Sequence, residues 1–418
     1  MDGAAPDRDT LLVSSALTLE RVRRDVEVLA HAGLDTTTFL AEAYESVQRA
    51  VPSSAACMAT LDPATHLTTG AFKFGGLAGR SDTDGVFGLL EYGHAESTSY
   101  VELVRAGVAA VGMHVATGGD VRRSRRVREL VQSCLGCTDE LRVVATAGRQ
   151  VWGGMAMFRD DRSAPYREDD VQFLSSLSGF LARGLRVGLL SRLAADPPVF
   201  PATGGPAVLV FEADGRLREA SVGAGGRLAE VVREVDAPGS SAVIASLLAA
   251  ARRYAAGMTD VLPSTRVRRR SGAWAVLHAS PLTSADGSAA RVVVTIEAAR
   301  PPEIVPLVVA AFGLTPRERD VTQLVLQGVE TREIAATLHL SPHTVQDHLK
   351  SIFHKTGVSA RRELVARVFF DQYVPRIGGL LSPSGGSSTH RPRGDEPITL
   401  LPRGGNSDRA AAAHRFRR

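Results

Sequence analysis

Three side chains with different hydrogen-bonding chemistry lie close together in the C-terminal part of the chain: Gln346, Asp347 and Lys350. Residues three and four apart are neighbours on a helix, so all three would share one face. An amide suits N6 and N7 of adenine, an ammonium suits O6 and N7 of guanine, and a carboxylate accepts from N4 of cytosine. The spacing therefore indicates a helix that reads base edges in the major groove of DNA.

The stretch around these residues has residues that favour the start of a helix at one end and its termination at the other. Ser341 is suited to the N-cap, Pro342 to the first helical position, and Gly357 to the position that ends the helix. Four residues recur at helical spacing and are predicted to face a core: Val345, His348, Leu349 and Ile352. The polar face would then point outward, with its N-terminal half toward the bases.

A shorter helix precedes this one and is joined to it by about three residues. Thr331 can cap it, and it would bury Ile334, Ala335 and Leu338. Two short helices linked so tightly cross steeply, which is the helix-turn-helix arrangement. Five polar or basic residues on these two helices are predicted to contact phosphates: Thr331, Arg332, Ser341, Thr344 and Lys355.

Two further helices complete an all-α, four-helix block over residues 314–375. In the first, Thr315 is the N-cap, Pro316 follows it, and Glu318 closes a capping box. The last begins near Ala360 and turns three apolar residues inward: Leu364, Val365 and Val368.

This block resembles the LuxR-type helix-turn-helix family of bacterial transcription factors. The family's motifs are carried here by LTPRE, GVETREIA, SPHTV followed by QDH, and HKTGV. The resemblance implies that Gln346, Asp347 and Lys350 read bases and that the fourth helix, through Leu364, Val365 and Val368, pairs two protomers. The expected partners are double-stranded DNA, a second copy of the chain and RNA polymerase. Asp347 departs from the basic or amide residue common at its position in the family.

A competing interpretation of the same block is a signal-dependent adaptor that uses its four helices for protein contacts. Residues 314–369 of this block include eight basic and six acidic residues, so the net charge is low for a surface that binds DNA. Salt separates the two interpretations, because DNA binding weakens steeply as ionic strength rises.

The composition predicts a multidomain, cytoplasmic protein. Of 418 residues, 44% are hydrophobic and 22% charged, which is ample for several packed cores. The N-terminus lacks the features of a signal peptide, and no uncharged apolar run reaches the ~18 residues of a membrane span, so no membrane partner is expected. Cys134 and Cys137 form a CxxC that we interpret as packing cysteines, with a redox pair or half of a zinc site as the competing interpretations. No metal, cofactor or catalytic set is expected, so the chain is predicted not to be an enzyme.

Composition shifts and periodicity divide the chain into seven segments. They are a flexible N-terminus (1–19), an α+β sensor domain (20–190), a linker (191–205), a second α+β domain (206–298), a connector helix (299–313), the helix-turn-helix domain (314–375) and a disordered basic tail (376–418).

The front two-thirds of the chain lack the patterns of three common regulatory inputs. There is no P-loop motif, no set of acidic residues and lysine typical of a phospho-receiver, and no clustering of tryptophan typical of an acyl-homoserine-lactone pocket. TLDPATHLTTGA, TGGDVRRSRRVREL and YREDDVQFLSSLSGFLARGLR instead resemble a GAF-like domain, and AVLVFEADGRL resembles the first strand pair of a PAS-like domain.

The GAF-like and PAS-like resemblances imply a small-molecule ligand of unknown identity. Candidate pocket residues are Cys57, Met58, Trp152, Met155 and Met157, with ordinary core packing as the competing interpretation. The arginine-rich run from Arg122 to Arg128 is interpreted as a solvated helix face, with anion binding as the competing interpretation.

Overall fold

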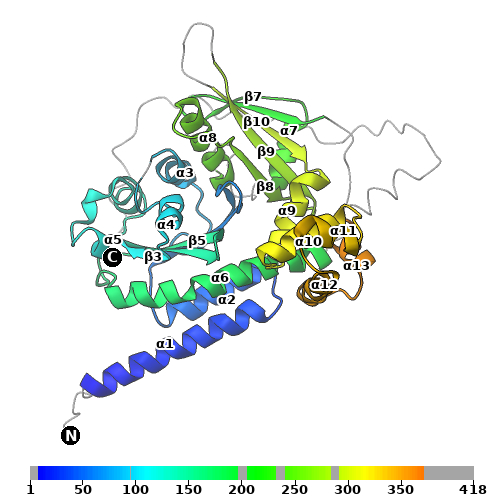
Figure 1. Cartoon of the computed structure of the whole chain (residues 1–418). Coiled ribbons are helices and arrows are strands. Elements are labelled where there is room, and N and C mark those ends of the chain that lie inside the picture. Colours follow the sequence, from blue (N-terminus) through cyan, green and yellow to red (C-terminus); the bar gives the residue numbers. More distant parts are fainter. Residues whose placement is uncertain (1–7, 95, 196–204, 232–240, 284–290, 371–418) are drawn as a thin grey trace. The chain divides into compact units, whose positions relative to one another are not determined.

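The computed structural model describes residues 8–94, 96–195, 205–231, 241–283 and 291–370 (Figure 1). The first module contains a five-stranded antiparallel sheet in the order β2-β1-β5-β4-β3. Its strands are β1 (Ala55–Leu61), β2 (Thr68–Gly75), β3 (Ala110–Gly112), β4 (Asp139–Ala147) and β5 (Gln150–Arg159). The predicted hairpin is confirmed: β4 and β5 are joined through Gly148, whose φ of +60° suits a tight turn.

Helices α2 (Thr36–Gln48) and α6 (Glu168–Ala195) pack on one face of this sheet, and α1 (Arg8–His31) packs on the outer side of these two helices. Side chains alternate along a strand, so β1 and β5 place Met58, Met155 and Met157 on this face. All three are at most 3% exposed and share one core with Leu177 of α6. The core side of the sheet is therefore filled by its own apolar side chains.

On the opposite face, α4 (Tyr100–Ala106), α5 (Met113–Ala116) and the π-helical η2 (Val127–Gln132) pack against the sheet. Two further segments, α3 (Asp84–Tyr92) and η1 (Val121–Arg123), pack against η2. Between them and the sheet, Arg142 donates to Glu91 at 2.7 Å and Arg126 donates to Glu140 at 2.9 Å. The interpretation of the arginine run as a solvated face is wrong at Arg126, which is fully buried because Glu140 neutralises it.

The second module also has a five-stranded antiparallel sheet, in the order β7-β6-β10-β9-β8. Its elements are β6 (Ala207–Phe211), β7 (Leu217–Ala220), α7 (Ala224–Val231), α8 (Ala242–Ala255), β8 (Ser264–Arg268), β9 (Trp274–Pro281) and β10 (Val292–Ala298). Along β9, Ala275 and Leu277 share a core with α8, while Trp274 and Val276 join the core that contains α6. The α+β character predicted for both modules is confirmed.

The predicted connector is a helix, α9 (Pro301–Ala311), and arginines from both modules hold its ends. Arg266 of β8 donates to the carbonyl oxygen of Glu303 in the first turn, at 3.0 Å. Arg186 of α6 donates to the carbonyl oxygen of Ala311 in the last turn, also at 3.0 Å. Asp62, at the end of β1, accepts from Nε of Arg266 at 2.7 Å. The first and second modules therefore meet at the start of α9.

The described residues of the C-terminal part form short helices joined by turns. It contains α10 (Pro316–Leu326), α11 (Thr331–Leu338), α12 (Pro342–Thr356), α13 (Arg361–Val365) and a terminal π-helical segment, η3 (Ala366–Phe370). The four predicted helices of this block are confirmed.

Two predicted boundaries differ from the described structure. Helix α1 begins at Arg8, inside the segment predicted to be a flexible N-terminus, and α6 continues to Ala195, inside the predicted linker. The rest of the linker up to residue 204, the end of the helix-turn-helix domain from residue 371, and the tail at 376–418 lie outside the described residues.

Among the described residues, one helix is long and apolar enough to cross a membrane by length and composition, over Glu168–Ser191. It buries Leu174, Leu177 and Leu181 in the core of the first module. Burial of this kind is typical of the central helix of a packed domain.

Candidate nucleic-acid interface

The first helix of the C-terminal block is fixed by its capping box. Thr315 accepts a hydrogen bond from the backbone N–H of Glu318, and the Glu318 carboxylate accepts from the backbone N–H of Thr315 at 2.7 Å. Pro316 occupies the first helical position, where a backbone N–H has no partner to lose. The predicted start of this helix is confirmed.

Helices α11 and α12 are joined by a turn of His339, Leu340 and Ser341. His339 ends α11 with φ of +54°, a left-handed conformation that reverses the chain sharply. Ser341 then caps α12 by accepting from the N–H of Thr344 at 3.0 Å. Glu330, one residue before the predicted cap, occupies the N-cap position of α11.

The inward faces of these two helices form one core. Ile334, Ala335, Val345, Leu349 and Ile352 are at most 5% exposed. The remaining predicted core residues, Leu338 and His348, are half-buried at its margin. This packing fixes which face of α12 points outward.

The outward face of α12 carries Gln346, Asp347 and Lys350, all of them exposed. The Asp347 carboxylate lies 3.5 Å from Nζ of Lys350 and 3.7 Å from Nε2 of His343. These contacts are exposed and weak, and they place the Lys350 ammonium and the His343 imidazole about one turn away on either side of the acid. Asp347 therefore helps to hold Lys350 over the face that carries all three groups.

The predicted phosphate contacts lie around the N-termini of α11 and α12, with one exception. Arg332 and Ser341 are exposed, and Thr331 and Thr344 are half-buried beside them. Backbone N–H groups at helix N-termini point outward and favour anions. The four residues and the two helix ends are thus arranged around the base of the α12 face.

Lys355, the fifth predicted phosphate contact, has an internal partner instead. Its Nζ lies 2.7 Å and 2.8 Å from the two carboxylate oxygens of Glu318, a residue that is 4% exposed. Burial alone would raise the pKa of Glu318, but hydrogen bonds from Lys355, Ser351 and the Thr315 N–H outweigh it and lower the pKa to about 2. Lys355 therefore fastens the end of α12 to the start of α10.

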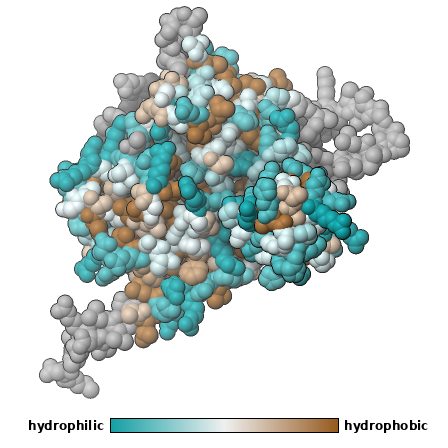
Figure 2. All heavy atoms as spheres, in the orientation of Figure 1, coloured by the Kyte–Doolittle hydropathy of each residue, from teal (hydrophilic) through white to brown (hydrophobic). Residues whose placement is uncertain are grey.

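The fourth-helix residues predicted to pair protomers lie partly inside the chain. Leu364 and Val368 are fully buried in the core that also contains Leu307 of α9, and Val365 is half-buried. In Figure 2 the surface over α10–α13 is mainly hydrophilic.

The five candidate pocket residues are not gathered in one place. Met58, Met155 and Met157 lie in the core under α6, whereas Cys57 lies on the other face of the sheet, where burial raises the pKa of its thiol to about 12. Only Trp152 of the five lines the large cavity that the described residues form. Elsewhere in the described ranges, no three His, Cys, Asp or Glu side chains converge on a metal position.

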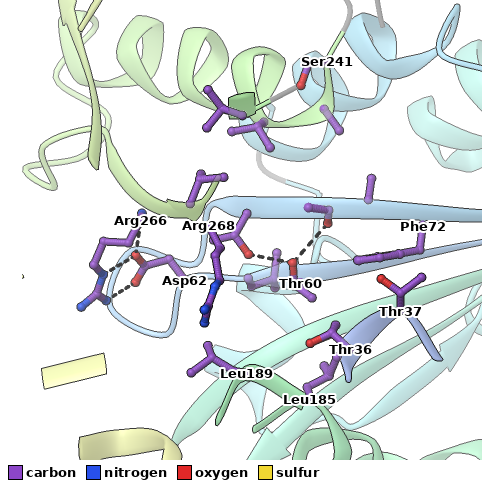
Figure 3. A pocket seen from close by; sticks show the side chains of 18 of the residues that line it. Thr36, Thr37, Thr60, Asp62, Phe72, Leu185, Leu189, Ser241, Arg266 and Arg268 are labelled. Carbon is purple, nitrogen blue, oxygen red and sulfur yellow. Dashed lines mark hydrogen bonds and ion pairs between the residues drawn. The ribbon is translucent and has the colours of Figure 1, made fainter. Parts of the chain in front are cut away.

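The cavity has a volume of about 640 Å³ and contains residues that sequence reasoning missed, among them Asp62, Arg266 and Arg268 (Figure 3). Its walls come from β2, β8, α6 and α9, elements far apart along the chain. No local signal in the sequence indicates that these elements meet.

Comparison with known proteins identifies the C-terminal block. Residues 313–368 match the family model of bacterial regulatory proteins of the LuxR family. These residues form a LuxR-family helix-turn-helix domain. The match ends at the C-terminal block, so the family is established for this part of the chain.

The LuxR-family domain is also the part shared with curated relatives. A putative HTH-type transcriptional regulator of Mycobacterium tuberculosis strain H37Rv is 48% identical over 53 residues, 13% of this chain and 6% of that protein. The transcriptional regulatory protein UhpA of Escherichia coli is 48% identical over 56 residues, 13% of this chain and 29% of UhpA. The chain thus matches well under two thirds of each relative.

Solved structures cover more of the chain at low similarity. The match to VqmA in a Vibrio cholerae VqmA–ligand–DNA complex covers 40% of this chain and 83% of the VqmA chain, with 16% identity and a TM-score of 0.22. A bacteriophytochrome from R. palustris covers 71% of this chain and 64% of its own, with 9% identity and a TM-score of 0.25. Scores this low do not establish a shared fold for the two modules.

Proposed function

We propose that the chain is a sequence-specific, DNA-binding transcription regulator that acts in the cytoplasm. The observation that carries this proposal is the exposed face of α12, which presents Gln346, Asp347 and Lys350 to solvent. The opposite face of the same helix is buried in the core of the LuxR-family domain. Each good pair between one of these side chains and a base discriminates by about 1–3 kcal/mol.

In this proposal the N-terminal ends of α11 and α12 sit on the DNA backbone. Thr331, Arg332, Ser341 and Thr344 contact phosphates and set the register of α12 in the groove. Lys355 is left out of the contact set because its ammonium already bridges to Glu318.

The protein binds DNA as a homodimer and acts on transcription through RNA polymerase. Pairing of protomers uses the fourth helix, where the half-buried Val365 is the most accessible of its three apolar residues. A two-fold dimer reads two half-sites about one helical turn of DNA apart. The first two modules are a GAF-like and a PAS-like sensor that adjust DNA binding to a small molecule, with no catalytic activity of their own.

The test is the salt dependence of binding by the full-length chain to labelled genomic DNA. Each neutralised phosphate contributes about −0.9 to the slope of log affinity against log salt. We expect a steep slope that becomes shallower by about one contact in Arg332→Ala, while Arg216→Ala, which removes an 85% exposed arginine of the second module, leaves it unchanged. A flat slope, or binding to a protein partner alone, would favour the adaptor interpretation.

A further inference from the structure

His343 lies on the same exposed face of α12 as Gln346, Asp347 and Lys350, in the first turn of the helix. At about 100° per residue, it is within about 60° of each of them around the helix axis. Its side chain is 86% exposed, whereas Val345, on the opposite side of the helix, is fully buried. The N-terminal residues of a recognition helix are the ones that meet DNA. A helix that reads bases through Gln346 and Lys350 therefore brings His343 against the DNA as well.

The imidazole of His343 shares a carboxylate with the ammonium of Lys350. Its Nε2 lies 3.7 Å from one oxygen of Asp347, and Nζ of Lys350 lies 3.5 Å from the other. Imidazole is the side chain whose ordinary charge change falls between pH 5 and pH 8. While the imidazole is neutral, the charges of Lys350 and Asp347 cancel. Once it is protonated, the three side chains together carry one positive charge.

Asp347 makes the charge of this face depend on the imidazole. With an amide at this position, the ammonium of Lys350 would leave the face positive at every pH. The carboxylate cancels that charge, so protonation of His343 turns a neutral face into a positive one. DNA binding gains from each positive charge that neutralises a phosphate, because a counterion is released.

Among the described residues, Asp347 is the side chain that forms an ion pair with His343. The helices that pack against α12 hold their acids elsewhere: Glu318 of α10 is bound by Lys355 at the far end of α12, and Glu363 of α13 accepts from a hydroxyl four residues before it. In the same ranges, three ionisable groups of α11 and the turn after it make no ion pair with the imidazole: Arg332, Glu333 and His339.

The position of His343 suits a phosphate. It is the second residue of α12, where the backbone N–H groups of the first turn point outward and favour anions. Ser341 caps the same helix end through the N–H of Thr344, and both residues are phosphate contacts in the proposed function. An imidazolium donates from both ring nitrogens, so one N–H can face Asp347 while the other reaches a phosphate oxygen.

We propose that His343 is a further DNA-contacting residue, and that protonation of its imidazole strengthens DNA binding as the pH falls from about 8 to about 5.5. The imidazolium donates to a backbone phosphate beside the bases that Gln346 and Lys350 read. The contact forms while the imidazole is protonated and is lost when it becomes neutral. It rests on the proposed function, because α12 must lie in the major groove for it to form.

The test is the salt dependence of DNA binding at two pH values, measured with the full-length protein and labelled genomic DNA. Each neutralised phosphate contributes about −0.9 to the slope of log affinity against log salt. We expect the slope to be steeper by about that amount per protomer at about pH 5.5 than at about pH 8. Affinity should rise about 10-fold over the same range, as expected for one hydrogen bond to a charged group.

Variants of His343 assign the change of slope to its imidazole. His343→Gln keeps a hydrogen-bonding side chain that stays neutral, so it should show the shallow slope at both pH values. His343→Lys is charged at both and should show the steep slope throughout. Position 343 is highly exposed, so neither change disturbs the core. His354→Gln, which changes an exposed histidine about 16 Å further along α12, is the matched control and should behave as the unaltered protein.

Three results would contradict the role of His343. A slope that is the same at both pH values, from a protein that binds DNA, would overturn this contact and leave the proposed function standing. A change of slope that persists in His343→Gln would assign the titrating group to another residue, with the same consequence. Absence of DNA binding at both pH values would overturn the proposed function and the His343 contact together.

Discussion

The carboxylate of Asp347 would be repelled by DNA phosphates if no positive charge lay beside it. Lys350 lies beside it on the same exposed helix face, so its ammonium partly neutralises the acid, and the His343 imidazole lies on the other side. Such an acid can accept from cytosine N4 or aim Lys350 at a guanine. At the scale of single residues, the reading surface is a small charge cluster and not a set of independent contacts.

Gln346→Ala and Lys350→Ala should each weaken binding to a preferred site by about 1–3 kcal/mol and relax preference at one base position. The measurement is competition binding against a set of singly substituted sites. Gln323→Ala, which changes an exposed glutamine on α10, is the control and should leave both affinity and preference unchanged. Equal loss on every sequence would mean that the two side chains touch only the backbone of DNA.

Glu318 gives the C-terminal block a dependence on acid. Its pKa is about 2 in the folded chain against an ordinary value of 4.5, so the ion pair with Lys355 stabilises the fold above about pH 4.5 and is lost as the pH falls toward 2. The contribution is of the order of 3 kcal/mol. Glu318→Gln retains a capping-box residue but removes the charge.

Urea unfolding from pH 6 to pH 3 compares the full-length protein with Glu318→Gln. The difference between their free energies of unfolding should become smaller as the pH falls. Glu363→Gln is the control, because the pKa of Glu363 is also lowered, mainly by the N–H and hydroxyl of Ser359, but its carboxylate lies in the solvent. A gap that stays constant with pH would show that the Lys355 contact does not stabilise the fold.

At the scale of elements, α9 connects the two modules to the DNA-binding block, because residues of both modules contact it and α10 follows it in the chain. Its last carbonyl group is bound by Arg186, and residue 313 lies against the same guanidinium. Gly313 also has φ of +70°, so a side chain there would meet both backbone strain and a collision. The join between α9 and α10 is thus set by one arginine and one glycine.

Arg186→Met should free the last turn of α9 while leaving α6 folded. We expect faster hydrogen exchange over residues 307–314 and little change in the sheet of the first module. Arg183→Met, which changes an exposed arginine one turn earlier on α6, serves as the matched control. Unchanged exchange in Arg186→Met would mean that apolar packing alone holds α9.

The helix-turn-helix elements were predictable because their signals are local. Thr315, Ser341 and Gly357 mark helix ends within a few residues of the hydrogen bonds they make, and the inward stripe of α12 can be read from its period. The partner of Lys355 was not predictable in this way. Glu318 is 37 residues earlier, and only the packing of α10 against α12 brings the two together.

At the scale of the whole molecule, the two modules are joined by contacts between residues remote in sequence. Asp62 and Arg266 are 204 residues apart, and Gly88 of α3 meets Ala245 of α8 so closely that a side chain at position 88 would collide with it. Each module's fold class followed from its strand and helix pattern. The cavity between them did not, because it exists only where the edge strands of the two sheets face each other.

Asp62→Asn should destabilise the protein by about 3 kcal/mol, because it leaves a largely buried Arg266 without its carboxylate. In a double-mutant cycle, Arg266→Met should recover part of that loss, which chemical unfolding measures. The control is Asp82→Asn, which breaks an exposed pair with Arg80 and should cost less than about 1 kcal/mol. Additive effects of Asp62→Asn and Arg266→Met would show that the pair does not join the modules.

The measurement that tests the central claim most directly is selection of genomic fragments by the purified full-length protein at physiological salt, beside Lys350→Ala. We predict enrichment of a shared, two-fold-symmetric sequence by the unaltered protein, with preference lost at one position of each half-site in the variant. Enrichment of no sequence by either protein, or of the same sequence with the same preference by both, would contradict the account of α12 as a helix that reads DNA.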